Sequence, residues 1–133
     1  MPSLATVAIE FDAGHDVIDP HLHHFRFEVG AVGSPASSGP TEGMVLDFRL
    51  LREALATHVR RPLEGRMLVG PDEGELSANC GLPILQFPVR PTAEHLAKWA
   101  YDRLVENLPA SDADRIECVT LWETPYAAGS YRP

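Results

Sequence analysis

The sequence predicts an α+β fold in which a small antiparallel four-stranded sheet carries two helices on one face. Two segments near the N-terminus alternate apolar and polar residues with the period of a strand, and the middle of the chain carries apolar residues at helical spacings. The chain then returns to strand-like residues, so the expected order is strand, strand, helix, helix, strand, strand. A length of 133 residues suits one compact domain, and we treat residues 1–133 as a single domain.

The four expected strands lie at the two ends of the chain. Residues 4–12 and 23–32 each place apolar side chains at alternate positions, which is typical of half-buried strands. Residues 33–43 are rich in Ser, Pro and Gly and are expected to form a loop. Residues 115–124 predict a third strand and residues 128–132 a short fourth one.

Two helices are expected between the strand pairs. The first spans residues 48–61 and has Asp47 in position to cap it. The second begins after Thr92, whose hydroxyl can serve as a cap, and covers residues 93–108. Residues 62–91 contain five prolines and are expected to be mostly irregular. Irregular segments of this length in a small domain usually serve a function.

Composition excludes several classes of protein. The net charge of −8 argues against nucleic acid as a partner, because phosphate binding needs clustered Lys and Arg. No apolar run approaches the ~18 residues of a membrane helix, and the N-terminus lacks the pattern of a secretory signal. Cys80 and Cys118 have no CxxC spacing and are expected to be reduced thiols. We therefore expect a cytoplasmic protein with no nucleic-acid or membrane partner.

The segment HLHHF, residues 21–25, concentrates histidines at the start of the second strand. His21 and His23 point the same way at about 6.6–7 Å spacing, so both can reach one zinc ion, whose nitrogen ligands lie about 2.0–2.1 Å away. The turn brings His15 beside them, whereas His24 must point to the opposite face. Three histidines with one open position are typical of a catalytic zinc. The alternative is a set of exposed or hydrogen-bonded histidines that bind no metal.

Five short motifs follow one another along nearly the whole chain. They comprise Phe11, Ala13 and His15; His21, Leu22, His23 and Phe25; Gly43, Val45, Asp47 and Phe48; Pro91, Thr92, Glu94, His95, Leu96 and Ala97; and Glu123, Thr124 and Tyr131. In this order and at these distances they resemble the family of 6-pyruvoyl-tetrahydropterin synthase and its bacterial relative, 6-carboxytetrahydropterin synthase of the queuosine pathway.

The resemblance implies a fold and a site. The fold is the tunnelling fold, in which subunits pool their strands into a barrel, as trimers or as hexamers, with sites between subunits. Self-association is also expected because a four-stranded sheet leaves two edges to cover. The resemblance further implies that the three clustered histidines bind Zn²⁺ and that Glu123 anchors a pterin by a charge-assisted pair. We place Thr92 and Glu94 with Glu123 as substrate-binding residues.

The chain departs from the family where the family's proton-transfer groups lie. Residues 16–20, where the resemblance places a catalytic cysteine, contain none, and the position of its proton-shuttling histidine is Gly65. Each such group typically contributes about 10²–10⁴ in rate, so the departures argue against ordinary synthase activity. Cys80 is the one thiol that could restore a cysteine mechanism. The titratable residues proposed as catalytic replacements are Asp16, Asp19, Glu64 and His24.

The leading hypothesis is therefore a zinc-dependent enzyme whose chemistry has diverged from the parent reaction. Zinc would polarise a hydroxyl or carbonyl of the substrate, and a lyase, cyclase or aldolase-type reaction in specialised biosynthesis would follow. One alternative is a genuine tetrahydropterin synthase with replacement bases. Another is a non-catalytic binding or scaffold protein that keeps the zinc.

Overall fold

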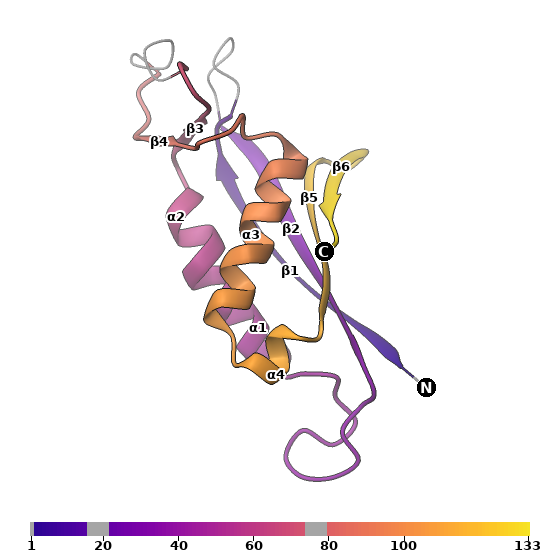
Figure 1. Cartoon of the computed structure of the whole chain (residues 1–133). Coiled ribbons are helices and arrows are strands. Elements are labelled where there is room, and N and C mark those ends of the chain that lie inside the picture. Colours follow the sequence, from indigo (N-terminus) through magenta and orange to yellow (C-terminus); the bar gives the residue numbers. More distant parts are fainter. Residues whose placement is uncertain (1, 16–21, 74–79) are drawn as a thin grey trace.

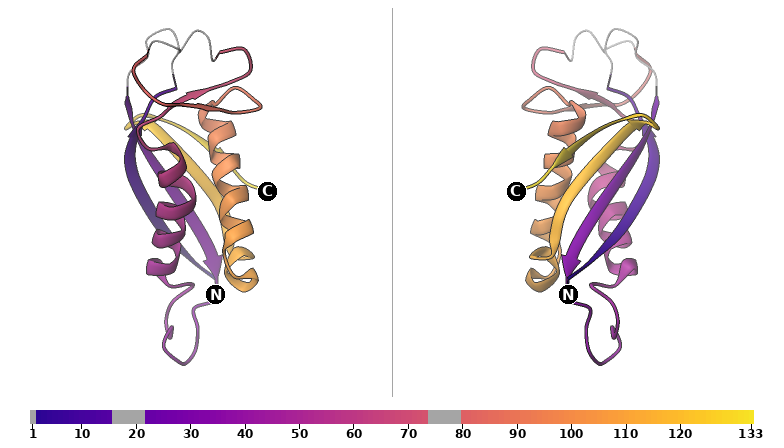
Figure 2. Two further views of the ribbon diagram at one scale, coloured as in Figure 1. Left: turned by 90° about the vertical axis from the view of Figure 1, so that its left-hand side faces the viewer. Right: turned by 90° about the vertical axis from the view of Figure 1, so that its right-hand side faces the viewer.

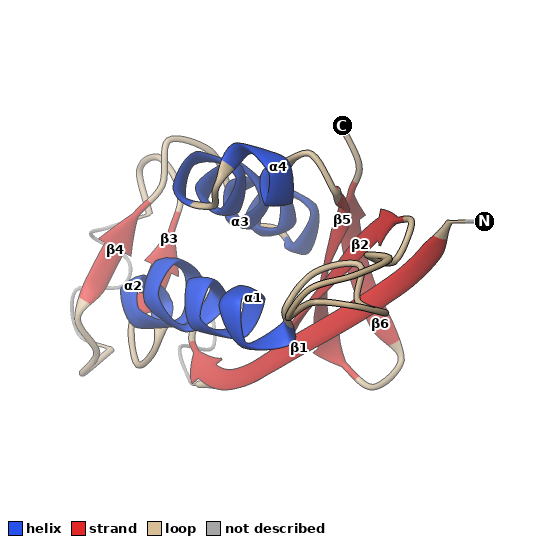
Figure 3. Cartoon of the chain, turned by 90° about the horizontal axis from the view of Figure 1, so that it is seen from below, coloured by secondary structure: helices blue, strands red, loops and turns tan. Residues whose placement is uncertain are grey.

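The structure is a computed structural model, and it describes residues 2–15, 22–73 and 80–133. Its main sheet has four antiparallel strands in the order β1-β2-β5-β6. The strands are β1 (Ser3–Ala13), β2 (His23–Gly33), β5 (Ile116–Thr124) and β6 (Ala127–Tyr131). Figure 1 shows them side by side, and Figure 3 shows the helices on one side of this sheet. The predicted fold class and sheet are thus confirmed.

The helices are α1 (Phe48–Leu55), the π-helical turn η1 (Ala56–Arg60), α2 (Arg61–Leu63), α3 (Ala93–Asn107) and the short α4 (Ala110–Ala113). Both predicted caps form. The Asp47 carboxylate accepts a hydrogen bond from the backbone N–H of Arg49 at 2.8 Å, and the Thr92 hydroxyl accepts one from the N–H of His95 at 3.2 Å. The sequence therefore specifies where both long helices begin.

The first helix continues past its expected end because of the wide turn η1. Pro62 has no N–H to donate and its ring crowds the carbonyl four residues earlier, which is that of His58. The structure accommodates this with π-type turns before Pro62, and the Nε of Arg103 on α3 donates to the His58 carbonyl at 2.6 Å. The hydrogen bond that proline removes within one helix is thus replaced by one that joins the two helices.

The core lies between the inner face of the sheet and the two long helices, seen edge-on in Figure 2. Alternate residues of the strands, such as Phe25, Phe27 and Leu121, are fully buried. On the helices the buried residues recur at three- and four-residue spacings, as Leu51 and Leu55 show. The buried apolar residues form one connected cluster, so the two helices and the sheet share a single core.

A second, parallel pair of strands lies in the segment expected to be irregular. It consists of β3 (Met67–Val69) and β4 (Ile84–Gln86). Each strand has three residues, too few to show an alternation in the sequence, and the pair is held by long-range contacts. Gly14, just after β1, bridges to Met67, and its carbonyl accepts a hydrogen bond from the N–H of Leu68 at 2.6 Å. This pairing brings the chain after β3 close to His15.

The outer face of the sheet is polar. Its side chains include Glu10, Asp12, His24 and Arg26, and the indole N–H of Trp122 donates to Glu28 at 3.1 Å on the same face. Because the inner face holds the core, each strand has the alternation of a sheet covered on one side only. In the described part of the chain, no helix is long and apolar enough to cross a membrane.

Candidate active site

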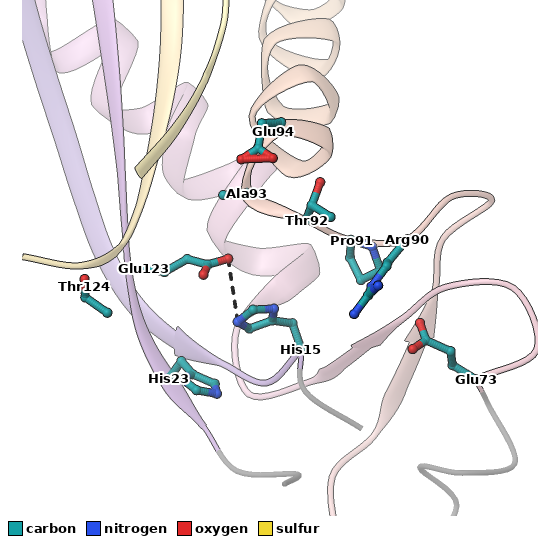
Figure 4. Close-up of a pocket in the computed structure, with 10 residues that line it drawn as sticks. All are labelled: His15, His23, Glu73, Arg90, Pro91, Thr92, Ala93, Glu94, Glu123 and Thr124. Atoms are coloured by element: carbon teal, nitrogen blue, oxygen red, sulfur yellow. Dashed lines mark ion pairs between the residues drawn. The ribbon is translucent and has the colours of Figure 1, made fainter. Parts of the chain in front are cut away.

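A cavity of about 640 Å³ opens where the ends of the central strands meet the start of α3. Its walls combine imidazoles, carboxylates, hydroxyls and one guanidinium, as Figure 4 shows. The described residues that line it are His15, His23, Glu73, Arg90, Pro91, Thr92, Ala93, Glu94, Glu123 and Thr124. Five of the ten site residues that the sequence suggests therefore share one cavity: His15, His23, Thr92, Glu94 and Glu123.

Two histidines form the floor of this cavity. His23 is the first residue of β2 and pairs in register with Ala13 of β1, and His15 follows β1 two residues later. Their ring centroids are 4.9 Å apart, and both side chains are half-buried. Adjacent imidazoles of this kind suit a zinc ion. His21 lies outside the described residues, and among the described ones no group of three or more His, Cys, Asp or Glu could hold a metal.

Glu123 projects into the cavity from the end of β5. Its Oε1 lies 3.7 Å from Nε2 of His15, with 28% of its side chain exposed and 20% of that of His15. This separation is too long for a hydrogen bond, although a protonated His15 would form an ion pair with Glu123. The carboxylate is therefore half-buried and has hydrogen-bonding capacity left for a ligand.

The start of α3 forms the opposite wall and packs directly on β6. A Cβ added to Gly129 would lie 2.6 Å from Oε1 of Glu94, 2.7 Å from its backbone nitrogen and 2.8 Å from Cβ of Ala93. Only a glycine fits between the helix and the strand at this point. Gly129 thus allows Thr92 and Glu94 to come as close to the sheet as they do.

Two charged lining residues, Glu73 and Arg90, were not suggested as site residues by the sequence. Both come from the segment expected to be irregular, and the length of that segment was the only indication that it serves a function. β3 and β4 carry this segment to the cavity by pairing with the end of β1. Arg90 is the one Lys or Arg among the described lining residues, and its guanidinium points into the cavity in Figure 4.

Two suggested catalytic residues, His24 and Glu64, are not among the described residues that line this cavity. His24 is on the outer face, where its Nδ1 lies 2.9 Å from Oδ1 of Asp12 and its Nε2 3.1 Å from Oε1 of Glu10. The hydrogen bond to Asp12, and then that to Glu10, raises the pKa of His24 above its ordinary value. Glu64 is exposed just after α2.

The two aspartates suggested as catalytic replacements, Asp16 and Asp19, lie outside the described residues. Both cysteines are free, and neither is among the described lining residues of the cavity. The thiol of Cys80 contacts the backbone of Leu82, with its Sγ 3.4 Å from the nitrogen and 3.6 Å from the oxygen. The described part of the cavity therefore offers carboxylates and imidazoles, and no thiol, for proton transfer.

The chain is a small α+β domain with a polar cavity that contains a pair of histidines. The profile of the family described as 6-pyruvoyl tetrahydropterin synthase matches residues 5–133. The chain therefore belongs to the 6-pyruvoyl tetrahydropterin synthase family.

Similar proteins agree with this assignment. The chain is 29% identical over 129 residues to a 6-carboxy-5,6,7,8-tetrahydropterin synthase of Rickettsia conorii, covering 90% of this chain and 93% of that protein. The structure of 6-pyruvoyl tetrahydropterin synthase from Caenorhabditis elegans superposes with a TM-score of 0.72 at 20% identity, covering 100% of this chain and 96% of the other. A Plasmodium vivax 6-pyruvoyltetrahydropterin synthase gives 0.71 at 14% identity, covering 98% of each chain. This chain and these solved structures share the tunnelling fold.

Proposed function

We propose that this protein is a zinc-dependent tetrahydropterin synthase that binds a pterin in the cavity and transfers protons with carboxylates in place of a cysteine. The observation that carries the proposal is the half-buried Glu123 carboxylate beside the His15 and His23 pair. A volume of about 640 Å³ lies within the range of about 300–1,000 Å³ typical of small-molecule sites.

Glu123 is the anchor for the pterin ring. The amino-pyrimidinone edge of a pterin presents two parallel N–H donors, and a carboxylate can accept both at once. Thr92 and Glu94 add a hydroxyl and a second carboxylate on the neighbouring wall. A ring held at this edge directs its side chain away from Glu123 toward the rest of the cavity.

The metal would be held by His15, His23 and the His21 that lies outside the described residues. When bound, zinc supplies a Lewis acid that polarises an oxygen of the substrate side chain and lowers the pKa of that oxygen. Glu123 lies 3.7 Å from His15, so the negative charge of its carboxylate would also favour binding of a cation at the histidines.

Two observations favour the synthase reaction over a diverged lyase. The Rickettsia relative, which covers 90% of this chain, is named a 6-carboxy-5,6,7,8-tetrahydropterin synthase. The Plasmodium protein is described as a mutant of a catalytic residue that is a glutamate. A carboxylate can therefore serve as a catalytic residue on this fold, which makes the absence of cysteine in residues 16–20 compatible with synthase activity.

The test is incubation of the zinc-loaded protein with dihydroneopterin triphosphate, followed by product analysis and by a separate measurement of pterin binding. We expect a tetrahydropterin product, and we expect Glu123→Gln to weaken pterin binding. Pterin binding with no product would favour the diverged enzyme. A protein that binds zinc but neither binds a pterin nor turns it over would be a scaffold or binding protein, and the proposal would be wrong.

We further propose that copies of this chain associate through the sheet. β1 and β6 are the outer strands of the four-stranded sheet, and each leaves one edge unpaired within the described chain. Pairing β1 of one copy with β6 of the next would continue the sheet toward a closed barrel, as trimers or hexamers. Light scattering coupled to size exclusion would distinguish these states. The cytoplasmic location stays a prediction.

A further inference from the structure

We propose that Glu73 is the acid–base residue of the cavity and that the turn Gly70–Glu73 exists to hold its carboxylate. The inference rests on the proposed function, because it assigns a task within that reaction. Glu73 was not suggested by the sequence, and it lines the cavity from a segment that β3 and β4 bring to the site.

The first support is the way in which the carboxylate is fixed. The backbone N–H of Gly70 donates to Oε1 of Glu73 at 2.6 Å, and the backbone N–H of Glu73 donates to the Gly70 carbonyl at 3.3 Å. One of these hydrogen bonds closes the turn through the backbone, and the other closes it through the Glu73 side chain. One carboxylate oxygen is thereby held by the protein, which leaves Oε2 as the oxygen available to a ligand.

The second support is the backbone of the turn itself. The ring of Pro71 fixes its φ at about −65°. Asp72 has a φ of 63°. This is the pattern of a type II turn, whose third position is normally glycine or asparagine. Asp72 is the one non-glycine residue with positive φ among those described. The residue next to Glu73 therefore has an unfavourable backbone conformation. Such conformations are common at functional sites, where the surrounding structure holds a side chain in one position.

The third support is the absence of space at Gly70. A Cβ added there would lie 2.8 Å from Oε1 of Glu73 and 3.0 Å from Cα of Arg90. The turn is thus packed between the carboxylate it holds and the backbone leading into α3. Any side chain at position 70 would displace Glu73 or Arg90, so the position of the carboxylate is determined from both sides.

The other lining side chains already have tasks or do not titrate in the useful range. The two histidines suit the metal, and Glu94 and Glu123 suit the pterin. An arginine guanidinium cannot act as a base in proteins, and threonine hydroxyls are poor bases. Glu73 is the remaining titratable group on the described walls, and Figure 4 shows it across the cavity from Glu123. A pterin anchored on Glu123 would extend its side chain toward Glu73.

In the proposed step, the ionised Glu73 removes the proton from the hydroxyl-bearing side-chain carbon that is attached to the dihydropterin ring. The electron pair of the broken C–H bond forms a C=C bond to the ring carbon, and the π electrons of that ring carbon's C=N bond pass to the ring nitrogen, which takes a proton from water. This gives an enol, and Glu73 becomes a carboxylic acid. Glu73 then returns its proton to the ring carbon as the enol hydroxyl gives its proton to water and becomes a carbonyl. The carboxylate ends as it began, and the step needs no oxidant or reductant.

The experiment compares the wild-type protein with Glu73→Gln, which keeps the size and the acceptor for the Gly70 N–H but cannot take up a proton. The matched control is Glu53→Gln, the same change at an exposed position on α1. With dihydroneopterin triphosphate as the probe, we expect kcat of Glu73→Gln to fall about 10²–10⁴-fold while pterin affinity is retained. The acidic limb of the pH profile of kcat should also vanish. The control should match the wild type.

A second pair of variants separates catalysis from folding. Glu73→Asp keeps the carboxylate and should retain part of the activity and an acidic limb, while Gly70→Ala should lower kcat with the pH limb preserved. Wild-type kcat in Glu73→Gln would overturn the inference and leave the proposed function standing. Equal loss of pterin affinity and kcat would make Glu73 a binding residue and also overturn it. A wild-type protein without turnover would overturn the proposed function and this role together.

Discussion

His23 and His24 are neighbours in β2 and face opposite sides of the sheet. His23 faces the cavity, where its ring lies 4.9 Å from that of His15. His24 faces outward, where Asp12 and Glu10 of β1 engage both of its ring nitrogens. The two residues show that strand alternation separates a side chain suited to a metal from one that is saturated with hydrogen bonds.

The carboxylates on the two faces of the sheet differ in how closely they approach a histidine. On the outer face the carboxylates of Asp12 and Glu10 lie within hydrogen-bond distance of the imidazole, which favours the protonated form of His24 and raises its pKa. In the cavity, Oε1 of Glu123 lies 3.7 Å from Nε2 of His15, which is too long for a hydrogen bond. A similar set of residue types thus yields a charge cluster on one face and a candidate binding site on the other.

The largest expected effect is on metal content. His23→Ala should reduce the zinc of the purified protein from about one ion per chain to almost none, because it removes one of three ligands. His24→Ala, one position away, should retain the metal. Elemental analysis of both variants, with circular dichroism to confirm folding, checks this difference. Equal metal content in the two would contradict the assignment of the inner histidines.

The next effect is on pterin binding, and it compares two glutamates that each lie near a histidine, one on each face of the sheet. Glu123→Gln should weaken pterin binding about 10- to 100-fold, because a hydrogen bond to a charged group is worth about 1.5–3 kcal/mol. The same change at Glu10 on the outer face should leave binding unchanged. Fluorescence titration with a pterin measures both affinities. A wild-type dissociation constant in Glu123→Gln would exclude it as the anchor.

A smaller effect is expected on stability from two glycines on opposite faces of the sheet. Gly129→Ala places a methyl group 2.6–2.8 Å from atoms of Glu94 and Ala93, which should lower the free energy of unfolding by about 1–3 kcal/mol. Gly30→Ala meets the Cys118 sulfur at 3.3 Å and the Leu4 side chain at 3.4 Å, and these side chains can move. Urea denaturation of both variants should show the greater loss for Gly129→Ala; the reverse order would contradict the close packing of α3 on β6.

The smallest effect is the titration of His24. Its pKa should lie above 6.5 and fall back toward that value in Asp12→Asn, because the hydrogen bond to Asp12 is the main cause of the shift. Since the folded-state pKa is raised, the associated stability is fully present below pH 6.5 and is lost as the pH rises through the raised value. The group is exposed, so its contribution is small. Imidazole proton shifts followed by NMR test this; no change in Asp12→Asn would refute it.

Most of the fold could be predicted from the sequence because its signals are local. The alternation in β1 and β2 and the caps Asp47 and Thr92 are each visible within a few residues. The strands β3 and β4 could not be predicted, since they are three residues long and depend on the bridge between Gly14 and Met67. The extension of the first helix past Pro62 depends on Arg103, which is also distant in sequence.

The candidate site shows the same division. His15, His23 and Glu123 belong to recognisable patterns, and the structure brings them into one cavity. Glu73 and Arg90 have no pattern of their own and reach the cavity only through the pairing of short strands. Strand alternation also places His24 on the other face, so a residue suggested as a replacement base lies away from this cavity.

The pairing of β2 with β5 has a consequence for how the protein is made. Phe27 pairs with Leu121, so strands from the two ends of the chain must meet before the cavity closes. Contacts so distant in sequence slow folding, because loop entropy is lost before the contacts are gained. During synthesis the hairpin of β1 and β2 leaves the ribosome long before β5 exists. The cavity is therefore expected to be among the last features of the molecule to form.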